Sequence, residues 1–207
     1  MNNKNKTKNK TKNKTKNKTK KNIHHLIEDH YPKNHKKKYD HWFYFKVDNI
    51  KDTNSFSIPN IRTYNDCNNP KLKHDWNGYQ VCYSYDNKIW ERLTTTTIEC
   101  NGKRTTVNWT FSKEPQNTAT TVWFAYYVPY PFSRTQKMFR GAEIIGHSNQ
   151  RRPILMKQYG HGPIKVWIIS GQHPAETINA WMLEGFVSRL HEKKAELFSK
   201  YTFYIVP

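Results

Sequence analysis

Short runs of aromatic and β-branched residues, separated by turn-rich pieces, dominate residues 41–128. Within the run 79–85, Val81, Tyr83 and Tyr85 alternate with smaller side chains. A period of two is typical of a strand with one buried face. Many short strands separated by turns predict an antiparallel β-sandwich. The predicted strands are 42–47, 55–58, 79–85, 105–111 and 120–128.

The last third of the chain has a different pattern, in which apolar runs alternate with one long helical segment. The run 165–170 is apolar on both faces, so we expect a central strand covered by helices. Ile178, Met182, Phe186 and Leu190 recur every four residues, and this spacing predicts a helix that packs one face on the sheet. Further strands are expected at 143–146, 154–159 and 203–207.

A proline-rich segment joins these two patterns. Pro129 and Pro131 end the last aromatic strand, because proline cannot donate a hydrogen bond to a neighbouring strand. Ser133 is a candidate cap for a short helix over 134–140. The fold class is therefore α/β, with an antiparallel β-sandwich followed by an incomplete mixed α/β domain. The predicted parts are a tail at 1–38, the sandwich at 39–130, a linker helix at 131–140 and the α/β domain at 141–207.

The tail is strongly basic and repetitive. Residues 1–38 hold fourteen lysines against two acidic residues, which accounts for +12 of the net charge of +19. Residues 5–20 repeat Asn-Lys-Thr-Lys without an apolar side chain, so burial cannot offset the entropy of ordering and we expect disorder. Such a tail can bind nucleic acid or an acidic surface through counterion release. The alternative is a solvated repeat without a partner.

Residues 23–30 predict a helical turn or two at the end of the tail. Four histidines in this region form either a weak metal-binding tract or a set of solvated side chains; they are His24, His25, His30 and His35.

Cysteines and tryptophans outside the tail have simpler interpretations. Cys67, Cys82 and Cys100 are odd in number and lack metal-type spacing, so we expect reduced thiols in a cytoplasmic protein. The start lacks the apolar run of a signal peptide, and no stretch approaches the ~20 apolar residues of a membrane helix. Sandwich packing is expected of four tryptophans, with an aromatic ligand surface as the alternative; they are Trp42, Trp90, Trp109 and Trp123.

The candidate site follows the apolar run 165–170. His173 lies at the predicted carboxyl end of this strand, where α/β sheets tend to bind ligands, and Glu176 precedes the helix. A neutral imidazole and a carboxylate suit Zn²⁺, which catalytic sites usually hold with three protein ligands and a water. His-x-x-Glu alone is a weak signal. The alternative is that His173 forms a hydrogen bond in the turn while Glu176 benefits from the helix dipole.

The wider sequence GQHPAETINAWMLEGFVSRL (171–190) resembles the zinc-site segment of the metallocarboxypeptidases, and most closely that of their cytosolic-type branch. FAYYVPYPFSRTQ (124–136), IIGHSNQRRPI (144–154) and FYIVP (203–207) resemble other passages of this branch, so the resemblance covers about residues 41–207. It implies that His173 and Glu176 are two zinc ligands.

The chain departs from the family pattern at two positions. Arg151 replaces a glycine, which costs stability if this turn requires a positive φ. Ala175 stands where the digestive-type enzymes have arginine, and a small residue fits the cytosolic-type branch. The family's third zinc ligand, carboxylate-binding arginines and glutamate base lie beyond the point that matches Pro207. No catalytic residue is therefore assigned within this chain, and His147 and His161, in turn-like sequence, are poor substitutes for the third ligand.

The resemblance predicts a zinc-dependent metallocarboxypeptidase that hydrolyses C-terminal amino acids from peptides or proteins. This chain corresponds to its N-terminal portion and is expected to be inactive alone. The expected partner is a peptide or protein C-terminus, without a membrane. One alternative is a non-catalytic remnant or binding module built on the β-domain, and another is a nucleic-acid-binding protein that uses the tail. The β-domain lacks a concentrated basic run, which argues against the second alternative.

Overall fold

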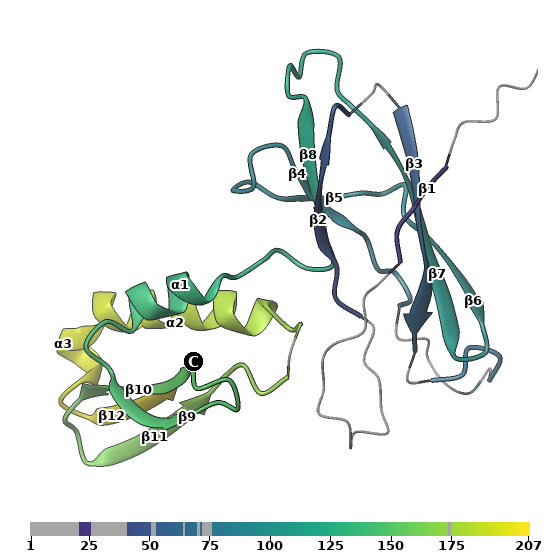
Figure 1. Ribbon diagram of the computed structural model, residues 1–207. Helices are drawn as coiled ribbons and strands as arrows, with labels where there is room; N and C mark the ends of the chain where they lie inside the picture. The colour runs from purple at the N-terminus through teal and green to yellow at the C-terminus, as the bar shows by residue number, and fades with distance from the viewer. Residues whose placement is uncertain are drawn as a thin grey trace, which may run out of the picture.

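The computed structural model describes residues 21–25, 41–50, 53–63, 65–69, 71, 76–173 and 175–207. The repeat at 5–20, His30, His35 and most of the predicted helical turn at 23–30 lie outside these residues. The fold is mostly β, with three four-stranded sheets, so the α/β class holds only for the second of its two units (Figure 1). No helix among the described residues is long and apolar enough to cross a membrane.

Two of the sheets form the N-terminal unit. One has the order β1-β3-β7-β6 and the other β2-β8-β4-β5, and all pairs are antiparallel except β1 with β3. The first sheet contains β1 (Lys21–Ile23), β3 (Thr53–Arg62), β7 (Arg104–Ser112) and β6 (Thr97–Asn101). The second contains β2 (Tyr44–Asp48), β8 (Thr121–Ala125), β4 (Cys82–Ser84) and β5 (Glu91–Arg92).

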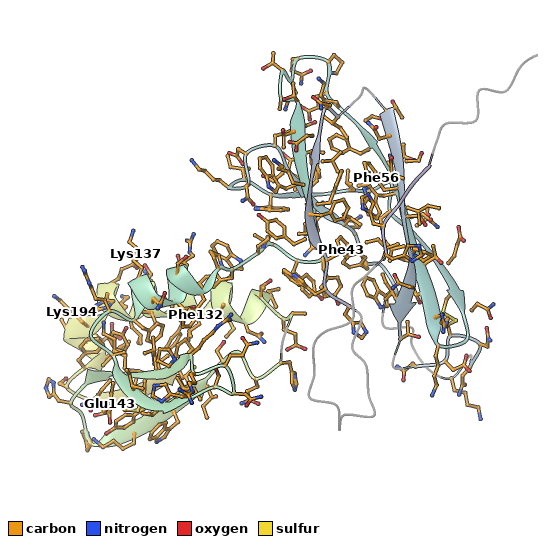
Figure 2. The ribbon with its side chains drawn as sticks, in the orientation of Figure 1. Phe43, Phe56, Phe132, Lys137, Glu143 and Lys194 are labelled. Carbon is orange, nitrogen blue, oxygen red and sulfur yellow. A yellow bond between two sulfur atoms is a disulfide. The ribbon has the colours of Figure 1, made fainter. Side chains whose placement is uncertain are left out.

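Aromatic side chains fill the space between these two sheets. Phe56 and Trp109 from one sheet meet Phe124 from the other, with ring centroids 4.8 and 5.5 Å from that of Phe124. Phe43 belongs to the same core, and Figure 2 labels it together with Phe56. The shared core confirms the predicted sandwich.

The predicted tryptophan roles hold only in part. Trp109 is buried in the core, but Trp42, Trp90 and Trp123 are only partly buried. Trp123 lies between Val122 and Phe124, which both point inward, so its own side chain emerges on the other face of β8. The second buried tryptophan is Trp76, which the sequence pattern did not single out because it lies in a turn.

Within the predicted tail at 1–38, Ile23 lies in a strand and not in the expected helical turn. Lys21–Ile23 form β1, and the His24 backbone N–H donates to the Ser57 carbonyl at 2.9 Å. The His24 ring stacks on Phe45 with centroids 4.3 Å apart, and desolvation lowers the pKa of this imidazole. A short polar segment can thus join a sheet edge when one aromatic ring reaches the core.

The expectation of three reduced thiols is also wrong, because Cys67 and Cys100 form a disulfide. The two residues are 33 apart in sequence, but the Cys67 N–H donates to the Gly102 carbonyl and brings the loop after β3 beside the end of β6. Sequence spacing cannot reveal a proximity that depends on sheet pairing. Cys82 is a free, buried thiol, and burial raises its pKa.

The second unit is a four-stranded sheet with three helices. Its order is β11-β12-β10-β9, with β11 and β12 parallel and the other pairs antiparallel. The strands are β9 (Glu143–His147), β10 (Pro153–Gly160), β11 (Ile164–Ile169) and β12 (Tyr201–Val206). The helices are α1 (Phe132–Met138), α2 (Ile178–Glu192) and α3 (Lys194–Leu197). The N-cap of α1 is Pro131, so Ser133 lies inside the helix and the predicted serine cap is wrong.

The predicted central position of the strand at 165–170 is wrong. β12 lies between β10 and β11, whereas β11, expected to be central, is an edge strand. Among the described residues, helices cover only one face of this sheet, where Leu183, Val187 and Phe139 pack on the strands (Figure 1). The other face leaves Trp167 59% exposed. An apolar run shows that both faces can be buried, but it cannot show which neighbours do so.

The buried face of α2 differs from the predicted one. Leu183, Val187 and Leu190 are buried, whereas Ile178 and Met182 are 57% and 62% exposed. Each four-residue step turns about 40° beyond a full helical turn, so a row of i+4 positions drifts off the buried face. Helix α2 therefore lies against the sheet core only from Leu183 onward.

The β1 contact predicts that two tail deletions behave differently. Deleting residues 2–20 should leave the thermal unfolding midpoint unchanged, because that segment has no apolar side chain to bury. Deleting residues 2–25 should lower the midpoint by about 2–4 °C, since it also removes β1 and the His24–Phe45 stack. Differential scanning calorimetry measures both shifts. Equal midpoints for the two deletions would show that β1 adds no stability.

The β9–β10 turn generates a second prediction. Arg151, which stands where the family pattern has glycine, has a positive φ of 57°. Its backbone N–H donates to the Ser148 carbonyl at 2.8 Å. Arg151→Gly should raise the free energy of unfolding by about 0.5–1 kcal/mol, because glycine adopts a positive φ without steric cost. Arg151→Ala is the matched control and should be nearly neutral in chemical denaturation. If alanine stabilises as much as glycine, loss of the charge is the cause and the backbone explanation is wrong.

Candidate metal centre

The loop between β11 and α2 carries both predicted ligands. The Ser170 N–H donates to the Val206 carbonyl at 2.9 Å, so β11 and β12 end together and the loop begins at the carboxyl edge of the sheet. Gly171 and Ala175 have φ of 64° and 71°, and these two left-handed residues flank His173 within the turn. The sequence-based placement of this loop is correct relative to the sheet edge, although β11 is not central.

His173 and Glu176 converge. His173 Nδ1 lies 3.3 Å from Glu176 Oε2, and the two side chains are 73% and 47% exposed. The Asn179 amide donates to the same Glu176 oxygen at 3.2 Å, which fixes the carboxylate against the first turn of α2. The loop therefore presents one imidazole nitrogen and one carboxylate oxygen side by side.

This pair fits two adjacent positions around a zinc ion. Donor atoms about 2.0–2.2 Å from a tetrahedral zinc lie roughly 3.3 Å apart, which matches the Nδ1–Oε2 separation. The same distance also fits a long hydrogen bond between His173 and Glu176 within the turn. This is the alternative interpretation of His173. The donor chemistry and the separation support a metal, and the assignment of a ligand role remains a proposal.

A third ligand does not accompany the pair. Within the described ranges, no three His, Cys, Asp or Glu side chains gather in a way that could hold a metal ion. His147 ends β9 and His161 follows β10, and both are exposed. The base and the carboxylate-binding arginine that the resemblance implies also have no assigned residue here.

A mostly apolar depression of about 300 Å³ adjoins the pair. The linker, the β9–β10 hairpin and the chain near Pro207 contribute to it together with the loop. Its walls are Tyr130, Phe132, Thr135, Pro153, Ile154, Leu155, Gly171, His173, Ala175, Glu176, Thr177, Ala180 and Pro207. The candidate ligands thus face a concave surface and do not project from a convex one.

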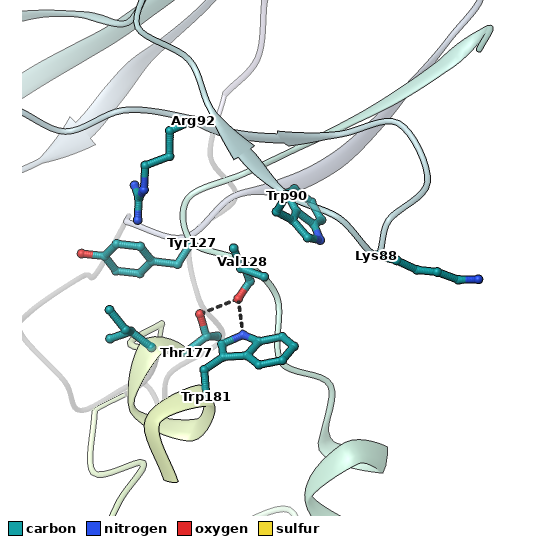
Figure 3. Close-up of a pocket in the computed structure, with 8 residues that line it drawn as sticks. Lys88, Trp90, Arg92, Tyr127, Val128, Thr177 and Trp181 are labelled. Carbon is teal, nitrogen blue, oxygen red and sulfur yellow. Dashed lines mark hydrogen bonds between the residues drawn. The ribbon is translucent and has the colours of Figure 1, made fainter. Parts of the chain in front are cut away.

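Two hydrogen bonds to one backbone oxygen join the site helix to the β-domain. The Thr177 hydroxyl and the Trp181 indole N–H both donate to the Val128 carbonyl, at 2.8 and 3.2 Å. Figure 3 shows this junction, which forms one side of a cavity of about 360 Å³ that Trp90 and Tyr127 also line. Sequence patterns missed it, because a backbone carbonyl carries no residue signature.

A charged cluster reinforces the same junction. Arg134 in α1 donates two N–H groups to the two carboxylate oxygens of Glu184 in α2. The Tyr130 hydroxyl donates to Glu184 Oε2 at 2.8 Å. The hydrogen bond from Arg134 is the main cause that lowers the pKa of Glu184, and desolvation is the main cause that raises the pKa of Tyr130. The proline-rich linker and α2 are thus fastened by complementary charge.

Acid titration should reveal this cluster. The lowered pKa means that ionised Glu184 stabilises the fold above its ordinary pKa, near 4.5, and that this stability is lost as pH falls through the lower folded value. Glu184→Gln should lower the free energy of unfolding by about 1 kcal/mol at pH 7. It should change this free energy almost not at all at a pH below the folded pKa of Glu184, where the carboxyl group is protonated.

Urea denaturation at several pH values gives the comparison. The control is Glu192→Gln, which removes a more exposed pair with Arg189 and should cost less at every pH. If Glu184→Gln lowers the free energy of unfolding by the same amount at every pH, the charge of Glu184 does not stabilise the fold as assigned.

Comparison with known proteins places this geometry in context. Residues 9–127 match the family described as the cytosolic carboxypeptidase N-terminal domain. A metallo-carboxypeptidase from Pseudomonas aeruginosa, solved in complex with (2-guanidinoethylmercapto)succinic acid, is 26% identical with a TM-score of 0.60, over 82% of this chain and 46% of that one. A metallo-carboxypeptidase from Burkholderia cenocepacia is 25% identical with a TM-score of 0.59, over the same shares.

An uncharacterized protein from Zymomonas mobilis is 27% identical over 187 residues, which is 84% of this chain and 46% of that protein. The chain thus spans less than half the length of each of these relatives. The family match covers more than half of the chain and the whole sandwich from β2 to β8. The chain belongs to the cytosolic carboxypeptidase N-terminal domain family.

Proposed function

We propose that this chain is the N-terminal portion of a zinc-dependent metallocarboxypeptidase that removes C-terminal amino acids from peptides or proteins. In this proposal the sandwich is the family's N-terminal domain, and residues 141–207 begin the catalytic domain. The observation that supports this function best is the 3.3 Å distance between His173 Nδ1 and Glu176 Oε2 at the carboxyl edge of the sheet. The similarity to two metallo-carboxypeptidases over 82% of this chain supports the proposal.

Each residue of the site has a separate task in this function. Zinc, when bound, would polarise the scissile carbonyl and lower the pKa of a bound water. His173 and Glu176 would hold the ion, and Asn179 would keep the Glu176 carboxylate oriented through its 3.2 Å hydrogen bond. Proton transfer and recognition of the substrate carboxylate would depend on residues outside these 207 positions.

A non-catalytic binding module is the second candidate function. The sandwich has its own closed aromatic core, and the family match ends at residue 127, just after the last strand of the sandwich. These observations favour a β-domain that folds by itself and binds a partner. The lysine-rich tail could add a nucleic-acid contact, which would follow from its charge alone.

A cytoplasmic location is part of the proposal and rests on the description of the family. In that compartment most thiols stay reduced. The Cys67–Cys100 disulfide would then be an exception.

Zinc titration tests the metal part of the proposal. The chain should bind zinc weakly, because stable sites have three or four protein ligands. His173→Ala and Glu176→Gln should each remove this binding, measured from the His173 imidazole signals or, in the first variant, by isothermal titration calorimetry. His161→Ala is the matched control, because His161 is exposed and remote in the sheet topology, and it should change nothing.

Activity provides the complementary test. The purified chain should release no C-terminal amino acid from peptides with varied last residues, with or without zinc, because several groups that act as a unit are missing. Release that is sensitive to a chelator and lost in Glu176→Gln would show that these residues alone complete a site. Zinc binding that survives both His173→Ala and Glu176→Gln would overturn the proposed ligands.

A further inference from the structure

The Val128 carbonyl lies where the chain leaves the sandwich, three residues after β8 and directly before Pro129. Its two donors, Thr177 and Trp181, are four residues apart and therefore lie one above the other on the same face of α2. A carbonyl oxygen has two lone pairs, so these donors use its full capacity. The contact is a two-point attachment of the first helical turn to the β-domain.

The Thr177 hydroxyl serves this attachment and not its own helix. Thr177 is the N-cap residue of α2, yet it forms no side-chain capping hydrogen bond. Threonine at this position usually bonds a free N–H of the first turn, which is worth about 1 kcal/mol. Here the hydroxyl instead reaches Val128, 49 residues away in sequence. The capping hydrogen bond expected within the helix is therefore replaced by a hydrogen bond to a distant part of the chain.

The beginning of α2 has little other support. Ile178 and Met182 in its first turns are exposed, and the buried residues of the helix start at Leu183. The loop before it contains Ala175 at φ of 71°, a conformation that non-glycine residues adopt only at a cost. The conformation of the Glu176 loop thus depends on contacts made by Thr177 and the residues that follow.

Trp181 is held from its other side by the linker. The Arg134 guanidinium lies 4.3 Å from the Trp181 ring centroid, and the Tyr130 ring meets the indole edge-on at 5.1 Å. These contacts leave the indole N–H directed at Val128 (Figure 3). The carbonyl, the indole and the guanidinium form one connected unit that joins the segment after β8 to α1 and α2.

We propose that Thr177 and Trp181 are positioning residues that transmit the position of the β-domain to the candidate metal ligands. Thr177 is bonded covalently to Glu176, so fixing its hydroxyl on Val128 fixes the backbone that carries the carboxylate. The inference rests on the proposed metal function, since it assigns the attachment a role in ligand geometry. It gives the β-domain a task in metal binding through the Val128 carbonyl.

The test compares Thr177→Val, which keeps the shape of the side chain and removes the hydroxyl, with Thr177→Ser, which keeps the hydroxyl. Zinc titration of the full chain, followed by the NMR signals of the His173 imidazole, should show about tenfold weaker binding for Thr177→Val. Thr177→Ser should bind as the native chain does. Trp181→Phe should weaken binding as well, because it removes the second donor to Val128.

Amide hydrogen exchange of residues 171–180 separates this inference from the metal proposal. Thr177→Val should exchange faster than Thr177→Ser in this loop while amides of β3 and β7 stay equally protected, whether or not the chain binds zinc. If the native chain binds no zinc, the metal proposal fails and the exchange result alone decides whether Thr177 positions the loop. Equal loop exchange and equal zinc affinity in the two variants would overturn the inference.

Discussion

The carbonyl oxygen of Val128 accepts two hydrogen bonds from the first turn of α2, and the relation between the two units of this protein depends on it. On one side lies a sandwich whose aromatic core is closed on itself. On the other lies a helix whose first turn begins beside His173 and Glu176. Because the oxygen belongs to the backbone, the attachment does not depend on the identity of residue 128, only on the course of the chain after β8.

Helix α2 has two kinds of support along its length. One side of it packs on the sheet through Leu183, Val187 and Leu190, as an amphipathic helix usually does. Its first two turns also form polar contacts with the linker, namely the hydrogen bonds to Val128 and the Arg134–Glu184 pair. The apolar contacts stabilise the unit, and the polar contacts set the direction in which the helix begins. The candidate ligands lie beside the polar contacts.

Much of the fold could be predicted from local patterns, because these depend on which face of an element is buried. Alternation around Val81 and Tyr83 correctly predicted a strand, and the loop with His173 and Glu176 follows a strand end at the carboxyl edge of the sheet, as expected. Features set by distant partners could not be predicted in this way. The Cys67–Cys100 disulfide and the place of β11 at the sheet edge both follow from the order of strands, which no single segment encodes.

The helix face shows a subtler limit of the same kind. Ile178 and Met182 belong to an apolar row in sequence, yet the sheet reaches only the later turns of α2. The attachment at Val128 was invisible for a further reason, since Thr177 at the start of a helix is expected to be a cap. In both cases a distant partner decides the role of the residue, and the local sequence does not identify that partner.

The edge position of β11 has a consequence for how these 207 residues behave by themselves at high concentration. An edge strand offers unpaired N–H and C=O groups to another molecule, and natural sheets often guard such edges with charged side chains, especially lysine. β11 has a lysine, Lys165, but its ammonium group donates to the Gly162 carbonyl and the Thr202 hydroxyl, both at 3.1 Å. The charge is thus turned toward its own sheet, and within these residues β11, which carries the exposed Trp167, is left without an electrostatic guard against self-association.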